Sequence, residues 1–169
     1  MAENWQEKLY ECLRKGGVDT FSYVPDAGHK ILIERSLADP NANAIALTSE
    51  QEGVALAIGC HLGGQKSVLL MQSSGLGNCV NYLSLIQGGG FPFLTLISMR
   101  GEYGEGNPWQ IPMGRAVKPV FEAMGGSCLV AERAEEVVGA AEAAMTMVFQ
   151  SGQSVALLLS QKLIGAKAF

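Results

Sequence analysis

Short apolar runs alternate with longer segments of helical periodicity along nearly the whole chain. The runs expected to form strands are Phe21–Val24, Ala44–Leu47, Ser67–Met71, Phe93–Met99, Cys128–Val130 and Val155–Leu159. Strands that are apolar on both faces and separated by helices are typical of a parallel sheet covered on both sides. The alternation therefore predicts an α/β fold, a three-layer α/β/α domain around a mainly parallel sheet of six strands.

The segments between the apolar runs have the period of helices. The first carries the stripe Trp5, Leu9 and Leu13 and stops at a glycine pair, and the others are expected at Ala27–Leu37, Glu50–Leu62, Leu76–Gln87, Pro112–Met124 and Ala134–Phe149. With 169 residues, 48% of them hydrophobic, the chain has the length and the core material of one domain. Residues 1–169 are predicted to form that single domain.

Composition argues against several classes of partner. The net charge is −4 and the 12 basic residues are scattered, which disfavours nucleic acid and anionic membrane surfaces because both require a clustered positive field. No apolar run approaches the roughly 18–20 residues of a membrane span, and the N-terminus shows no secretory signal. Four cysteines without a CxxC pair indicate reduced thiols in a cytoplasmic protein.

The least ordinary stretches follow the predicted strands. They are Pro25–Lys30, Thr48–Glu52, Gln72–Asn78 and Arg100–Arg115. Ligands of parallel α/β sheets bind beyond the carboxyl ends of the strands. We therefore expect the functional site in these four segments.

Glycine-rich turns raise the question of a nucleotide site. The stretch SSGLGNCV, Ser73 to Val80, follows a strand and opens a helix, so its glycines allow backbone amides to approach a ligand. It is an incomplete dinucleotide fingerprint because Val80 stands at the third glycine position, which leaves nicotinamide binding as an alternative. The stretch GGQKS, Gly63 to Ser67, precedes a strand and has Gln65 within its Gly-Lys-Ser core, so it is rejected as a phosphate loop.

Few titratable side chains stand in these segments. Glu50 follows a strand end, where it either compensates the helix dipole or takes part in proton transfer. His29 also follows a strand end and could face a site, whereas His61 is interpreted as a structural or exposed residue. No HExxH or comparable spacing occurs, so no protein-supplied metal site is predicted.

Four motifs in this order carry a specific resemblance. The segments YVPDAGHKIL, TSEQEGVALAIG, MQSSGLGNCVNYLSLI and GNPWQIPMGR resemble the pyrimidine-binding domain of thiamine-diphosphate-dependent enzymes. They are most similar to the alpha subunit of sulfopyruvate decarboxylase and to phosphonopyruvate decarboxylase. The resemblance implies a 2-keto-acid decarboxylase that acts on sulfopyruvate or phosphonopyruvate.

The resemblance also implies roles for individual residues. Glu50 would hydrogen-bond the aminopyrimidine and activate it, and Gln110 would lie near the reacting centre as a second catalytic residue. The implied cofactor contacts, beside Glu50, are Ser74, Gly75, Leu76, Gly77 and Asn78. The implied substrate-facing residues are Asp26, Ala27 and His29. Ser49 stands where we expect a basic residue in sulfopyruvate decarboxylases, so the choice between the two substrates stays open.

Half of the implied active site is absent from the sequence. Members of the family bind diphosphate and Mg²⁺ through a second domain with a GDG motif, and no aspartate here is flanked by glycines. The resemblance therefore implies a separate beta subunit that holds the diphosphate and the Mg²⁺, in a hetero-oligomer whose cofactor is thiamine diphosphate. An alternative is a non-catalytic binding or regulatory subunit of the same fold.

Two further features bear on such a site. His29, Lys30, Arg100 and Arg115 supply cations for a doubly anionic substrate. The loop Arg100–Trp109 is rich in glycine and ends in an aromatic residue, so it is expected to be a mobile connection, a lid or an interface segment.

Overall fold

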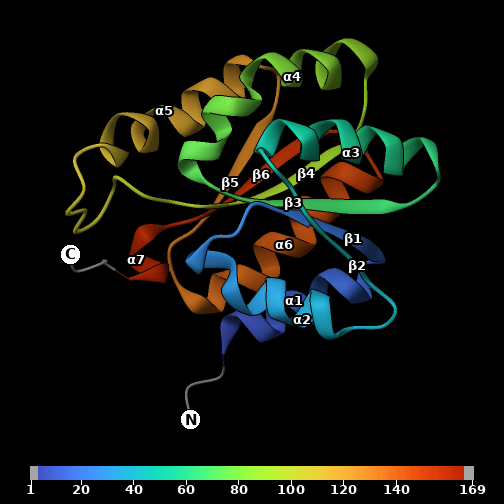
Figure 1. Ribbon diagram of the computed structural model, residues 1–169, viewed down its shortest axis with the longest axis horizontal. Helices are drawn as coiled ribbons and strands as arrows, with labels where there is room; N and C mark the ends of the chain where they lie inside the picture. The colour runs from blue at the N-terminus through green and yellow to red at the C-terminus, as the bar shows by residue number, and fades with distance from the viewer. Residues whose placement is uncertain (1–3, 166–169) are drawn as a thin grey trace.

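The computed structural model describes residues 4–165 and shows a sheet between two helix layers (Figure 1). The outermost residues of the predicted domain, 1–3 and 166–169, lie outside the described part. The helices are α1 (Trp5–Lys15), α2 (Lys30–Ala38), α3 (Glu50–Leu62), α4 (Leu76–Gly89), α5 (Gln110–Ala123), α6 (Ala134–Phe149) and α7 (Gln161–Ile164). The strands are β1 (Val18–Tyr23), β2 (Asn43–Ala46), β3 (Lys66–Gln72), β4 (Phe93–Ser98), β5 (Ser127–Ala131) and β6 (Ser154–Leu159).

The sheet has six strands in the order β2-β1-β3-β4-β6-β5, and every neighbouring pair is parallel. This confirms the predicted α/β class and the three layers. The central strands are buried on both faces: all six residues of β4 are buried, for example. Such strands contain continuous apolar runs because helices cover both of their faces.

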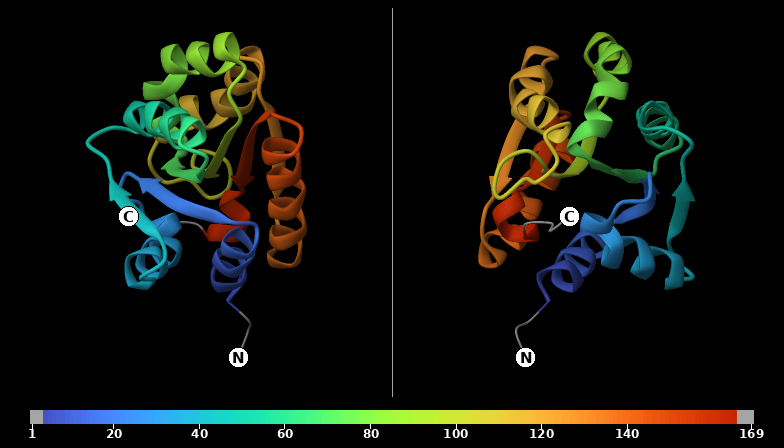
Figure 2. Two further views of the ribbon diagram at one scale, coloured as in Figure 1. Left: turned by 90° about the vertical axis from the view of Figure 1, so that its right-hand side faces the viewer. Right: turned by 60° about the vertical axis from the view of Figure 1, so that its left-hand side comes forward.

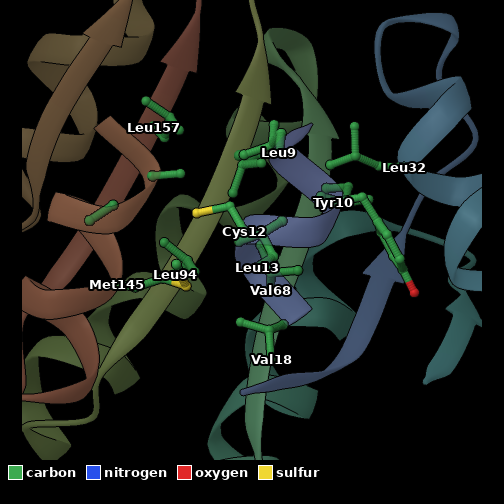
Figure 3. Packing of buried hydrophobic residues seen from close by; sticks show 14 of the residues in the cluster. Leu9, Tyr10, Cys12, Leu13, Val18, Leu32, Val68, Leu94, Met145 and Leu157 are labelled. Carbon is green, nitrogen blue, oxygen red and sulfur yellow. The ribbon is translucent and has the colours of Figure 1, made fainter. Parts of the chain in front are cut away.

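Each face of the sheet has its own apolar core. On one face Leu9 and Leu13 of α1, Leu32 of α2 and Met145 of α6 pack against the strands (Figure 3). On the other face α3, α4 and α5 supply a second cluster, to which Phe121 belongs. The views in Figure 2 show the strands between these two helix layers.

The strand order places a switch point between β1 and β3. These strands are neighbours, yet the helix that follows β1 packs on one face and the helix that follows β3 packs on the other. Where the connections part in this way, a crevice opens beyond the carboxyl ends of the strands. The segments after Tyr23 and Gln72 therefore flank the natural ligand crevice of this fold.

Three local differences from the expected elements have physical reasons. β1 begins at Val18 rather than Phe21, because its polar residues Thr20 and Ser22 are buried in the sheet rather than placed in a loop. Residues 27–29 form a short 3-10 turn before α2, since the Asp26 side chain accepts a hydrogen bond from the Gly28 amide. Helix α7 was not expected, since four residues are too few to show a period.

Candidate active site

The carboxylate of Asp26 joins the ends of three strands. Its Oδ2 accepts hydrogen bonds from the Gly28 amide at 2.9 Å and from Ser98 Oγ at 2.6 Å, and its Oδ1 accepts one from Gln72 Nε2 at 3.1 Å. Burial raises the pKa of this carboxyl, but the hydrogen bonds from Ser98 Oγ, Gln72 Nε2 and the Gly28 amide outweigh it, so the pKa lies below its usual range. Asp26 is therefore an ionised anchor between β1, β3 and β4.

Gln72 extends this connection toward the glycine turn. While its Nε2 donates to Asp26, its Oε1 accepts a hydrogen bond from Ser74 Oγ at 2.9 Å. Ser73 and Ser74 belong to a 3-10 turn that leads directly into α4. The chain Asp26–Gln72–Ser74 thus fixes the turn at the switch point of the sheet.

Glu50 is the first residue of α3 and is only 8% exposed. Its Oε2 accepts a hydrogen bond from Asn78 Nδ2 at 2.7 Å, across the gap between α3 and α4. A Cβ added to Gly75 would lie 2.6 Å from both Cγ and Oε1 of Glu50, so the missing side chain makes room for this carboxyl group. The neighbouring Glu52 has a local role instead, because it accepts a hydrogen bond from the Thr48 amide at 2.9 Å.

Helix α5 begins beside the glycine turn. A Cβ on Gly77 would lie 3.4 Å from Met113 Sδ, and α5 packs along the turn that contains Ser73–Gly75. At the start of this helix the Oε1 atom of Gln110 is buried and has no hydrogen-bond partner. Buried side-chain oxygens are rarely left unpaired, so this atom is suited to a ligand group.

The loop between β4 and α5 is held by a buried ion pair. Arg100 contacts Glu105 through two hydrogen bonds of 2.6 Å, and the two side chains are only 9% and 3% exposed. The Arg100 guanidinium and the amides of Asn107 and Gly101 hold the pKa of Glu105 well below its usual range. Arg100 is therefore committed to the loop and is not a free cation for an anionic substrate.

Gln161 fastens the same loop to the end of β6. Its Oε1 accepts hydrogen bonds from the amides of Glu102 and Tyr103 at 3.0 Å each, and its Nε2 donates to Glu105 at 3.1 Å. Glu102 in turn accepts from Ser160 Oγ at 3.1 Å. The expected mobile connection is thus tied down by side chains, while Tyr103 remains 56% exposed and Trp109, at the loop's end, 83% exposed.

The substrate-facing residues predicted from the resemblance have different surroundings. Ala27 is exposed, but His29 is completely buried, with its Nε2 3.1 Å from the Met71 carbonyl oxygen. Burial lowers the pKa of His29 below its usual value, so the ring is neutral and Nε2–H donates to Met71. The Nδ1 atom has no partner among the described residues. His29 does not reach the surface of this chain.

The predicted cofactor contacts gather in one place. Ser74, Gly75, Leu76, Gly77 and Asn78 form a continuous stretch from the turn into α4, and Glu50 lies against it. Leu76 is fully buried in the core, whereas Gly77 and Asn78 are exposed. The structure therefore brings Glu50 together with Gly75 and Asn78 of this stretch.

Sequence reasoning placed Gln72 and Glu105 within the segments expected to form the site but gave neither a role, and it missed Gln161. Gln72 ends a strand that reads as apolar, and Gln161 lies 56 residues from Glu105 along the chain, so no local spacing connects them. The signal that could have found Gln161 is position, because it follows β6 at the carboxyl edge of the sheet, where polar residues gather.

Residues 4–165 contain no group of three or more histidine, cysteine, aspartate or glutamate side chains placed to hold a metal ion. Within the same residues, no helix is long and apolar enough to cross a membrane. The four cysteines are unpaired.

Comparison with known proteins identifies relatives of this chain. The chain is 38% identical over 122 residues to the alpha subunit of sulfopyruvate decarboxylase from Methanococcus maripaludis, across 72% of this chain and 73% of that subunit. It is 32% identical over 151 residues to the same subunit from Methanocaldococcus jannaschii, across 89% of each. The chain belongs to the family of sulfopyruvate decarboxylase alpha subunits. Its relatives are decarboxylases, which confirms the predicted family. No family model matches the sequence.

The family extends to longer enzymes. Phosphonopyruvate decarboxylase from Streptomyces viridochromogenes is 38% identical over 101 residues, which cover 59% of this chain and 25% of that enzyme. Among solved structures, benzoylformate decarboxylase from Polynucleobacter necessarius superposes with a TM-score of 0.77 at 20% identity, over 98% of this chain and 31% of that one. This chain thus shares its fold with roughly a third of the benzoylformate decarboxylase chain.

Proposed function

We propose that this chain is the alpha subunit of a two-subunit, thiamine-diphosphate-dependent decarboxylase of sulfopyruvate. The observation that carries the proposal is the Glu50 carboxyl, nearly buried at the carboxyl edge of the sheet and held between Asn78 and Gly75. A nearly buried carboxyl with one oxygen hydrogen-bonded and the other without a partner among residues 4–165 is suited to exchange a proton with a ligand. The relatives of this chain are named as sulfopyruvate decarboxylase alpha subunits, which supports decarboxylation of sulfopyruvate as the reaction.

The residues present fit the pyrimidine end of that cofactor. Glu50 would hydrogen-bond a nitrogen of the aminopyrimidine and hold the proton that moves to and from it. The orphaned Gln110 Oε1 would accept a hydrogen bond near the reacting atoms, and Gly75 leaves room for Glu50. Thiamine diphosphate supplies the carbon nucleophile and the electron sink that removal of carbon dioxide from a 2-keto acid requires.

We propose that a beta subunit supplies the diphosphate site and the Mg²⁺ ligands. The name "subunit alpha" of the relatives supports a partner chain. The loop Arg100–Trp109 offers a surface for it, because the buried ion pair holds the loop in place while Trp109 stays 83% exposed. Such preorganisation lowers the entropy that association costs. Four unpaired cysteines support a reducing, cytoplasmic setting.

We propose sulfopyruvate rather than phosphonopyruvate as the substrate, because the relatives named as sulfopyruvate decarboxylases match this chain over 119–151 residues and those named as phosphonopyruvate decarboxylases over 101–107. Arg115, exposed on α5 and without an ion pair among residues 4–165, would be a cation for the sulfonate, since Arg100 is paired with Glu105. The Asp26 oxygens already accept three hydrogen bonds. Asp26 would therefore hold the ends of β1, β3 and β4 in place and would not contact the substrate anion.

Affinity capture of the tagged chain from its native cells tests this proposal. We expect a stoichiometric second chain with a diphosphate-binding motif, and a complex that releases carbon dioxide from sulfopyruvate only with thiamine diphosphate and Mg²⁺. Phosphonopyruvate and pyruvate serve as comparison substrates. A chain that returns alone, or a complex that releases no carbon dioxide from sulfopyruvate, would overturn the proposal.

A further inference from the structure

Glu50 is held from two sides by groups of different chemistry. Asn78 Nδ2 donates to Oε2 at 2.7 Å, while the backbone of Gly75 lies against Oε1 and Cγ. Asn78 is exposed and Glu50 is 8% exposed, so the amide reaches inward from the rim of the site to the carboxyl. The two carboxyl oxygens are therefore not equivalent.

This asymmetry decides where a proton can reside. An amide N–H that points at Oε2 stabilises that oxygen as an acceptor and opposes a proton on it, because two hydrogens would then face each other. Oε1 accepts no hydrogen bond from residues 4–165, so it is the oxygen free to carry the proton. The choice between the oxygens is made by Asn78.

We propose that Asn78 is a positioning residue that fixes Glu50 and selects Oε1 as the oxygen that exchanges a proton with the pyrimidine. This inference rests on the proposed function and assigns Asn78 a role different from the direct cofactor contact that the resemblance implies. Asn78 acts through Glu50, so its contribution exists only while Glu50 has a carboxyl group.

The hydrogen bond is not required to hold the two helices together. Helices α3 and α4 share an apolar core to which Val54, Leu76, Cys79 and Leu83 belong, all of them nearly or fully buried. Removal of an exposed amide leaves this core intact. We therefore expect variants of Asn78 to fold and to assemble as the wild type does.

A double-mutant cycle in the assembled complex tests the role of Asn78. The variants are Asn78→Ala, Glu50→Gln and the double variant, with Asn81→Ala, an exposed asparagine on the same helix, as the matched control. The readout is deuterium exchange at the reactive carbon of bound thiamine diphosphate, followed by quenched-flow NMR without substrate. We expect Asn78→Ala to slow exchange about tenfold, the effect of losing a hydrogen bond to a charged group. In the Glu50→Gln background Asn78→Ala should have no further effect, and Asn81→Ala should leave exchange unchanged.

A second readout requires no cofactor. In the cofactor-free complex labelled with ¹⁵N-asparagine, Glu50→Ala should move the side-chain amide signals of Asn78 and leave those of Asn81 in place. Three results would each overturn the inference. The first is a wild-type rate of deuterium exchange in Asn78→Ala, and the second is a double variant whose exchange is slowed by the product of the two single effects. The third is that the side-chain amide signals of Asn78 do not move in Glu50→Ala. Wild-type exchange in Glu50→Gln would instead overturn the proposed function, and the role of Asn78 with it.

Discussion

Gly75→Ala tests whether the position of Glu50 controls activity. The added methyl group would lie 2.6 Å from Cγ and Oε1 of Glu50, whereas ordinary contacts of a Cβ begin at 3.4 Å. The carboxyl must therefore retreat by about 0.8 Å, and a misplacement near 1 Å in an active site costs on the order of a hundredfold in rate. Because the methyl group displaces the end of a side chain rather than backbone, we expect the free energy of unfolding to fall by only about 1 kcal/mol.

The assay is turnover of the assembled complex at saturating cofactor, with urea unfolding of the same preparations. Gly59→Ala is the control, since it adds a methyl group to α3, the helix that Glu50 begins, where no atom lies within 4 Å. That control should keep wild-type turnover and raise the free energy of unfolding by about 0.5–1 kcal/mol, because alanine favours a helix interior over glycine. Turnover of Gly75→Ala within threefold of wild type would refute the reasoning.

Three further predictions concern stability and association. Glu105→Gln leaves Arg100 buried without its counter-charge, so urea unfolding should show a loss of about 3 kcal/mol, and a loss below 1 kcal/mol would contradict the role of this pair. Burial lowers the pKa of His29 in the folded chain. As the pH drops below about 6.5, His29 therefore takes up a proton in the unfolded chain but stays neutral in the folded chain. Stability should therefore fall from about pH 7 to pH 5, and it should fall less steeply in His29→Asn. Trp109→Ala should weaken capture of the partner while shifting the free energy of unfolding by less than about 0.5 kcal/mol; unchanged capture would exclude the loop from the interface.

The sequence predicts the fold because its signals are local. Each predicted apolar run overlaps a strand of the sheet, and α3 begins at Glu50 as expected, where acidic residues favour the first turn. Helix α5 spans Gln110–Ala123 close to the expected range although Pro119 lies inside it. The boundaries that differ, such as the start of β1 at Val18, depend on burial of polar residues in the sheet, which has no local signature.

The site is only partly visible in the sequence. Motif resemblance indicates Glu50 and the stretch around Gly75, and the structure brings them into contact. The partners that hold them are set by tertiary packing: Asn78 lies 28 residues from Glu50, and Ser98 lies 72 residues from Asp26. The loop after β4 reads as flexible because it is rich in glycine, yet a distant glutamine, Gln161, and a buried ion pair hold it in place.

The most direct test of the account compares wild type and Glu50→Gln in the complex of this chain with its beta subunit. The substitution keeps the shape of the side chain and removes its ability to exchange a proton. With equal assembly, we expect carbon dioxide release from sulfopyruvate to fall by at least about a hundredfold, the usual contribution of a general acid–base group. Release within twofold of wild type would contradict the central claim that Glu50 is the proton-exchanging residue of this subunit.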